Sequence, residues 1–199
     1  TKPVDSGVLD GLLEKAFYVE STFQNTEGYQ ELDQVIKQLG VQNTLFYLST
    51  PPGWYSTIVE KIGELQMETC PDGWRRIVVE KPFGRDLSTA LSLDAKLHSV
   101  FSEEQIYRMD HYLGKETVQN ILAFRFGNGI FEPLWNRKYI DHIQITMAES
   151  EGVGTRAGFY DKAGVVRDVF QNHLLQLLTL TAMEAPAVFN AKAVRDEKV

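Results

Sequence analysis

The sequence predicts an α/β protein in which a parallel sheet is followed by the start of an α+β region. Helical and strand-like patterns alternate from residue 1 to about 110, as parallel strands with crossover helices require. Beyond residue 115 this alternation stops. The chain has 199 residues, 43% of them hydrophobic and 24% charged, which is typical of a globular protein with a sizeable core.

The first 110 residues divide into amphipathic segments and short apolar runs. Apolar side chains at helical spacing predict helices over about 8–17, 29–39, 58–65 and 86–101. Gly40 stands where the second helix needs a C-terminal cap. Apolar runs between turn residues predict strands at 45–48, 76–80 and 106–109, the first of them buried. Because ligands of parallel sheets bind at the carboxyl ends of the strands, we expect a site at residues 49–52, 80–84 and 110–115.

The remaining residues have a different pattern, so we place a domain boundary near residues 110–116. A short helix is predicted from Glu116 to about Phe126. Apolar residues at 143, 145 and 147 alternate with polar or small ones, which predicts an antiparallel strand. Glycines at 152, 154 and 158 indicate a loop. A strong helix is predicted over 164–185, ended by Pro186.

Composition excludes several classes of protein. The net charge of −7, from 20 basic and 27 acidic residues, argues against a nucleic-acid partner. No apolar run approaches the ~18 residues of a membrane span, and the first residues do not form a signal peptide. The single cysteine, Cys70, cannot form an internal disulfide, which favours a reducing compartment. Neither end carries a start or stop signal, so we expect a segment of a longer protein.

His173 is the residue with two open interpretations. It lies on the predicted apolar stripe of helix 164–185, where a core histidine is the ordinary reading. A histidine at the edge of a cleft would instead be a proton acceptor near neutral pH. Asp168 is a poor partner for it, because five residues along an α-helix amount to roughly 140° of rotation. Any carboxylate that orients His173 is therefore expected from elsewhere in the chain.

The other candidates are weaker on residue type alone. The segment from Asp110 to Lys115 joins a strand to a helix, and it is either a phosphate site or a solvated helix start. Lys81, held before Pro82, either faces a cleft or lies on the surface. Isolated carboxylates such as Glu149 and Asp168 are usually surface groups. No histidine or cysteine pattern has the spacing of metal ligands, so the sequence predicts no metal site.

Three segments together resemble the glucose-6-phosphate dehydrogenase family: residues 76–86, 108–116 and 167–176. The stretch Asp-His-Tyr-Leu-Gly-Lys-Glu at 110–116 is that family's signature. Further stretches at 46–52, 131–137 and 194–199 follow in the family's order, so the resemblance covers most of the chain.

The resemblance implies a role for each matching position. His173 matches the base that takes the proton from the C1 hydroxyl of glucose 6-phosphate, and Asp110 matches the carboxylate that orients it. Lys81 matches a lysine between the sugar and the nicotinamide. Tyr55 matches a position on the cofactor side. The remaining matches bind the substrate, through its sugar hydroxyls (Glu149, Asp168) or its phosphate (His111, Tyr112, Lys115).

The implied activity is the oxidation of glucose 6-phosphate at C1 to the lactone, with hydride transfer to NADP. This is the entry step of the pentose phosphate pathway. The resemblance also implies a homo-oligomer in the full-length enzyme, located in the cytoplasm or a plastid. The alternative is a truncated, non-catalytic protein that binds sugar phosphate or a partner.

One feature departs from the family. The Gly-rich strand–turn–helix that holds the dinucleotide pyrophosphate does not occur in these 199 residues. We therefore expect a partial Rossmann-like dinucleotide-binding domain at 1–110, lacking its first unit, and a partial α+β sugar-phosphate domain at 111–199.

Overall fold

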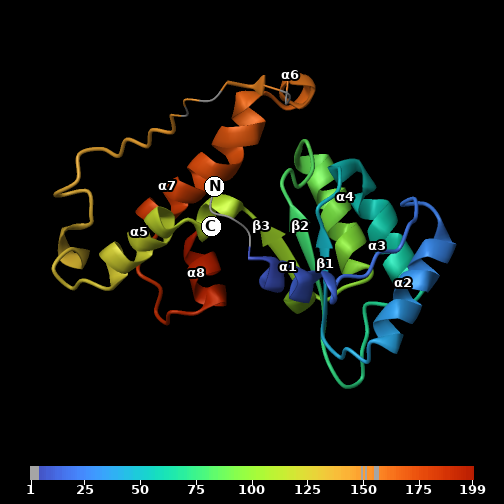
Figure 1. The fold of residues 1–199 in the computed structure, drawn as a ribbon. Coiled ribbons are helices and arrows are strands. Elements are labelled where there is room, and N and C mark those ends of the chain that lie inside the picture. Colours follow the sequence, from blue (N-terminus) through green and yellow to red (C-terminus); the bar gives the residue numbers. More distant parts are fainter. Residues whose placement is uncertain (1–4, 149, 151, 155–156) are drawn as a thin grey trace. The chain divides into compact units, whose positions relative to one another are not determined.

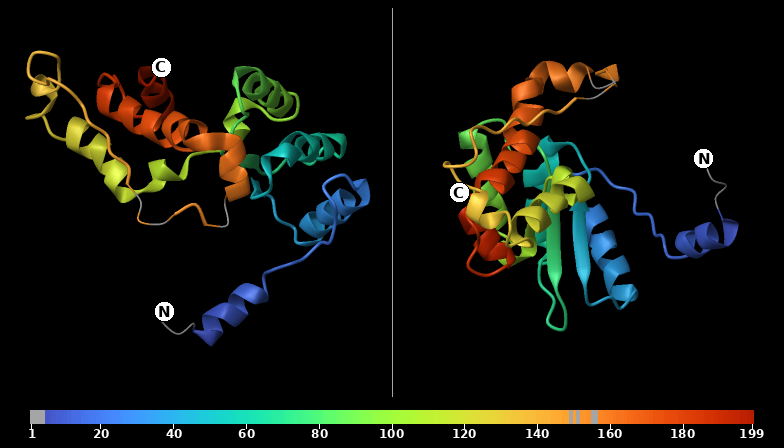
Figure 2. Two further views of the ribbon diagram at one scale, coloured as in Figure 1. Left: turned by 90° about the horizontal axis from the view of Figure 1, so that it is seen from above. Right: turned by 90° about the vertical axis from the view of Figure 1, so that its left-hand side faces the viewer.

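The computed structural model describes residues 5–148, 150, 152–154 and 157–199 (Figures 1 and 2). They form two compact units. The first contains the residues up to Val78 together with Ser92–Tyr107, and the second contains Val79–Leu91 together with Arg108–Val199. The predicted α/β fold with a parallel sheet is confirmed. The predicted domain boundary near residue 110 stays a prediction.

A three-stranded sheet of order β1-β2-β3 is built from β1 (Thr44–Leu48), β2 (Arg75–Glu80) and β3 (Ile106–Met109). The helices that precede or connect these strands are α1 (Ser6–Leu13), α2 (Thr26–Gln38), α3 (Tyr55–Glu64) and α4 (Leu87–His98). Single 3₁₀ turns lie at Pro52–Trp54 and Glu103–Gln105. In Figure 1, α2, α3 and α4 lie on one side of the strands.

The first strand, predicted to be buried, is buried on one face only. Phe46 and Leu48 are buried in the core of the first unit, with Ile62, Leu97 and Phe101 among their buried companions. Leu45 and Tyr47, whose side chains leave the opposite face, are about half exposed, at 51% and 52%. Successive side chains of a strand point to opposite faces, and within the first unit α2 and α3 lie on one side of β1 (Figure 1).

The first predicted helix begins and ends earlier than its apolar residues suggest. It covers Ser6–Leu13 because the Asp5 carboxylate caps it, accepting hydrogen bonds from the backbone N–H groups of Gly7 and Val8 at 2.9 and 3.3 Å. The predicted cap at Gly40 is confirmed, since its φ of 63° is a conformation that glycine adopts readily.

The second unit is mainly helical. Its elements are the 3₁₀ turns His111–Gly114 (η3) and Glu132–Leu134 (η4), and the helices α5 (Glu116–Phe126), α6 (Ala157–Val165), η6 (Val166–Leu174), α7 (Leu175–Ala182) and α8 (Ala191–Glu197). Helix α5 has the predicted bounds. Its Val118 packs with Leu180 and Met183 in the core of this unit. The buried Arg125 guanidinium donates to the Leu180 and Met183 carbonyls at 2.9 and 2.8 Å.

Two predictions for this region are corrected. Residues 143–147 form no strand, because the described residues around them offer no partner strand to complete a hydrogen-bonded ladder. The helix predicted over 164–185 consists of two parts, η6 and α7, and ends at Ala182. Gly164, with φ 70°, separates it from α6, which begins at Ala157 within the predicted loop. The segment η6 is then a π-helix, whose hydrogen bonds join residues i and i+5.

Candidate functional site

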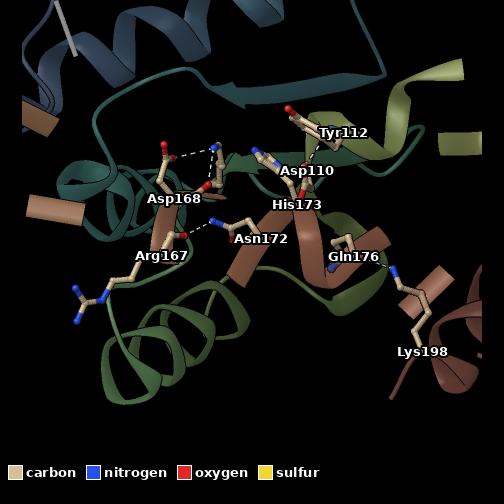
Figure 3. A network of polar contacts seen from close by, with 9 residues as sticks. Asp110, Tyr112, Arg167, Asp168, Asn172, His173, Gln176 and Lys198 are labelled. Carbon is tan, nitrogen blue, oxygen red and sulfur yellow. Dashed lines mark hydrogen bonds and ion pairs between the residues drawn. The ribbon is translucent and has the colours of Figure 1, made fainter. Parts of the chain in front are cut away.

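A histidine–aspartate pair lies at the centre of the second unit (Figure 3). The Nδ1 atom of His173 is 2.6 Å from Oδ1 of Asp110. Both side chains are largely removed from solvent, at 3% and 13% exposure. A contact this short between buried groups places a hydrogen on Nδ1 and leaves Nε2 as the basic nitrogen. The pair can therefore accept a proton at Nε2 while the carboxylate stabilises the resulting imidazolium.

Local chain geometry fixes the carboxylate of this pair. Asp110 follows β3 directly and caps the turn η3, because its Oδ1 atom also accepts the backbone N–H of Tyr112 at 3.0 Å. Its Oδ2 atom is buried and has no hydrogen-bond partner among the described residues. The two hydrogen bonds at Oδ1 thus hold this capping aspartate against His173, while its other oxygen has no partner among the described residues.

Two aromatic side chains of the same turn contact the imidazole. The Tyr112 ring is stacked on it, with centroids 3.9 Å apart and an interplanar angle of 21°. The His111 ring meets it edge-on, at 4.8 Å and 66°. The turn η3 therefore encloses the imidazole with a carboxylate, a ring face and a ring edge.

Burial lowers the pKa of His173 below the ordinary histidine value. Desolvation is the largest cause, the Asp110 carboxylate acts in the opposite direction, and the Lys81 ammonium and His111 lower the pKa further. A base with a lowered pKa is neutral, and so able to accept a proton, throughout the neutral pH range.

Lys81 and Asp168 form a second polar pair in this unit. The Nζ atom of Lys81 donates to Oδ1 of Asp168 at 2.9 Å and to its backbone carbonyl at 3.0 Å. The Asp168 side chain is 4% exposed and the Lys81 side chain 20% exposed. Lys81 immediately follows β2, so two strand ends, at Lys81 and Asp110, supply residues to this site.

Lysines supply the positive charge of the site. The Lys115 ammonium lies over the Tyr112 ring, 3.6 Å from its centroid. Lys198, which the sequence patterns did not single out, donates to Oε1 of Gln176. Desolvation lowers the pKa of Lys198 and the nearby Asp110 carboxylate raises it, which puts this ammonium within electrostatic reach of the pair. Lys198 follows a short helix and lies in the stretch 194–199 that resembles the family, but that stretch alone predicts no role for it, and only the tertiary structure reveals its position.

The other predicted residues have different outcomes. Tyr55 is buried in the core of the first unit, at 1% exposure, and its cofactor-side role stays a prediction. Glu149 lies outside the residues that the structure describes.

Asp110, His111 and His173 offer three possible metal-ligand atoms within 4.8 Å of one another. Because Lys81 and Lys198 add positive charge at the same place, an anion suits these surroundings better than a dication.

Both parts of the chain match known sequence families. Residues 1–120 match the model described as glucose-6-phosphate dehydrogenase, NAD binding domain, and residues 122–199 match glucose-6-phosphate dehydrogenase, C-terminal domain. The class is thus that of α/β proteins with a domain described as NAD binding, in agreement with the parallel sheet. Within this class, the chain belongs to the glucose-6-phosphate dehydrogenase family.

Individual relatives agree with this assignment. Glucose-6-phosphate 1-dehydrogenase of Aggregatibacter actinomycetemcomitans is 59% identical over 155 residues, which are 78% of this chain and 31% of the relative. Glucose-6-phosphate 1-dehydrogenase of Rhizobium meliloti is 49% identical over 93% of this chain and 37% of its own. A solved glucose-6-phosphate dehydrogenase in complex with its substrate glucose-6-phosphate superposes with a TM-score of 0.89 at 40% identity, covering 98% of this chain and 41% of the other. The chain spans less than half the length of these relatives.

No helix in the described part of the chain is long and apolar enough to cross a membrane.

Proposed function

We propose that this chain supplies the acid–base and sugar-phosphate residues of a glucose-6-phosphate dehydrogenase, which oxidises C1 of glucose 6-phosphate to the lactone and reduces NADP. The observation that carries the proposal is the buried contact of 2.6 Å between His173 and Asp110. A protein that only binds sugar phosphate has no need of an oriented base, so this contact favours the catalytic function over the non-catalytic alternative.

In the proposed reaction His173 takes the proton of the C1 hydroxyl at Nε2. The bond from Nδ1 to Asp110 keeps Nε2 unprotonated before the reaction and stabilises the imidazolium afterwards. The carbon–hydrogen bond at C1 breaks at the same time, and bound NADP would supply the acceptor for the hydride. Solvent water is kept from the base, because the His173 side chain is only 3% exposed.

The cations of the site would bind the substrate phosphate. His111, Tyr112 and Lys115 occupy one turn and the start of the next helix, so a single rigid segment carries these donors. Lys198 adds an ammonium that approaches from α8. A dianionic phosphate held by these groups orients C1 toward His173 without taking part in the bond changes. Lys81 and Asp168 are assigned to binding the sugar part of the substrate. Glu149 is assigned to the same role on the resemblance alone.

The first unit fits a nucleotide at its strand ends. Thr50 follows β1, and its hydroxyl is buried without a hydrogen-bond partner among the described residues. It lines a cavity of about 580 Å³ that extends along β1, together with Phe46 and Leu48. An orphan hydroxyl at such a strand end suits a bound polar ligand. Thr50 would then contact NADP in the first unit, whereas Tyr55 and Lys81 are assigned to the cofactor on the resemblance alone. Because β1 is at the edge of the described sheet, a further strand could pair with it, which supports a partial dinucleotide-binding domain over 1–110, followed by the sugar-phosphate domain over 111–199.

The resemblance extends the proposal to the whole protein. We infer the use of NADP, assembly into a homo-oligomer and a reducing compartment, the cytoplasm or a plastid. The lone thiol of Cys70 is consistent with such a compartment.

The test compares this chain with the whole protein that contains it. NADPH formation from glucose 6-phosphate is followed by absorbance at saturating NADP and substrate. We expect turnover by the whole protein and none by the 199-residue chain, because the chain has no Gly-rich turn to hold the pyrophosphate. Turnover by the chain alone would show that the Gly-rich unit is dispensable. Absence of turnover in the correctly folded whole protein would leave the non-catalytic alternative.

A further inference from the structure

The Tyr112 ring has a group on each of its faces. The His173 imidazole is stacked on it at 3.9 Å, and the Lys115 ammonium lies 3.6 Å from the same centroid. Two groups at these distances cannot share one face of a ring without overlapping, so they take opposite faces. The ring is thus in contact with the base on one side and with a cation of the phosphate-binding segment on the other.

One hydrogen bond does not by itself orient an imidazole. The torsion that rotates a histidine ring about its Cβ–Cγ bond is broad, so a bond at Nδ1 leaves the plane of the ring partly free. A ring stacked at an interplanar angle of 21° removes that freedom. It thereby determines the direction in which Nε2 points.

The two restraints on His173 come from one rigid element. Oδ1 of Asp110 accepts both the His173 Nδ1–H and the Tyr112 backbone N–H, so the carboxylate and the tyrosine backbone have fixed positions relative to each other. His111, at 4.8 Å and 66°, closes the remaining side. The carboxylate alone would set the position of Nδ1, whereas carboxylate and ring together also set that of Nε2.

We propose that Tyr112 is a positioning residue for the base, whose ring fixes the plane of the His173 imidazole so that Nε2 faces the C1 hydroxyl. This role rests on the proposed function and is separate from the phosphate-binding role of the tyrosine hydroxyl. The two roles belong to different atoms, so two substitutions distinguish them. Tyr112→Phe keeps the ring and removes the hydroxyl, whereas Tyr112→Leu removes both.

Steady-state kinetics of the whole enzyme provide the first test. Tyr112→Phe is expected to raise KM for glucose 6-phosphate, and its kcat is the reference for the ring, since the ring that acts on the base is retained. Tyr112→Leu is expected to lower kcat by a further two- to tenfold or so, the fold-change equivalent of one aromatic stack. The control is Tyr139→Leu, because Tyr139 is 66% exposed and lies outside the site. Equal kcat values for the Phe and Leu variants would overturn the proposal.

A spectroscopic test needs no activity. In this chain the His173 ring protons, assigned with His173→Asn, should resonate upfield because they lie over an aromatic face. Tyr112→Phe should keep that upfield position, and Tyr112→Leu should lose it. Identical positions in the Phe and Leu variants would show that no stack exists. Failure of the proposed function itself is recognised separately, by unchanged turnover in whole-enzyme His173→Asn.

Discussion

Replacing Asp110 by asparagine tests the charge of the pair with little change of shape. Oδ1 of Asp110 accepts from both His173 and the backbone of Tyr112, at 2.6 and 3.0 Å. An amide oxygen can accept both bonds, so the asparagine is expected to keep its oxygen at that position. Its NH₂ group then takes the place of Oδ2, which has no partner among the described residues. The main loss is the negative charge beside the imidazolium.

The size of the effect follows from the separation of the charges. Two unit charges about 4 Å apart, in surroundings with an effective dielectric constant of ~20, interact by ~4 kcal/mol. Because the imidazolium forms only as the reaction proceeds, this energy is lost from the transition state, and kcat should fall by about 10³. If the asparagine amide instead flips so that its NH₂ group donates to Nδ1 of His173, the histidine takes the wrong tautomer as well. The loss of kcat then rises to about 10⁴-fold.

The assay measures kcat for NADPH formation by the whole enzyme at saturating substrate. Asp196→Asn serves as the matched control, since Asp196 is an exposed carboxylate paired with Lys192 on the surface of α8. In this chain, histidine resonances followed against pH should show that Asp110→Asn lowers the pKa of His173 further, because the carboxylate raises it. A kcat within tenfold of wild type, or an unchanged pKa of His173, would refute the electrostatic role of Asp110.

Three further predictions concern turnover, pH and stability. In steady-state kinetics, whole-enzyme His173→Asn should lower kcat by on the order of 10²–10⁴-fold with little change in substrate affinity. In binding measurements, Lys115→Ala should chiefly raise the Kd of glucose 6-phosphate. Because the pKa of His173 is lowered on folding, the unfolded chain binds more protons than the folded chain at pH values below the ordinary value of 6.5. The free energy of unfolding should therefore fall as the pH drops through that range. Urea titrations of His173→Asn should lack this part of the pH dependence. His98→Asn should change the slope in the opposite direction, since hydrogen bonding raises the pKa of His98. Arg125→Met should lower the free energy of unfolding by about 2–4 kcal/mol, because two buried carbonyls lose their donor. The control Arg195→Met, on the exposed face of α8, should change it little. Equal urea-unfolding midpoints for the two variants would contradict this prediction.

Local sequence patterns were sufficient for the parallel part of the fold. Strands β1, β2 and β3 and helix α5 lie where apolar runs and helical spacing predict them, because both features depend on neighbouring residues. The period-two pattern of residues 143–147 also describes a local preference. It does not produce a strand, because pairing depends on a second strand elsewhere in the chain.

The candidate site was predictable where a motif covers it and not elsewhere. Asp110, His111, Tyr112 and Lys115 lie in one short stretch that a sequence can show. Lys198 comes close to Asp110 only because α8 packs in the second unit. The family-like stretch 194–199 contains Lys198, but neither its spacing nor its residue types indicate that approach.

The π-helix explains why the predicted apolar stripe is not the buried face. Rotation by ~100° per residue would place Asp168 and His173 on different sides of an α-helix. In η6, where residues five apart are nearly one turn apart, both side chains are buried, at 5% and 3% exposure. Val166 and Phe170 are turned outward instead, at 62% and 51%. An α-helix with the same sequence would bury its apolar residues and separate the two polar ones. The wider turn therefore allows one helix to present a carboxylate to Lys81 and an imidazole to Asp110 at the same time.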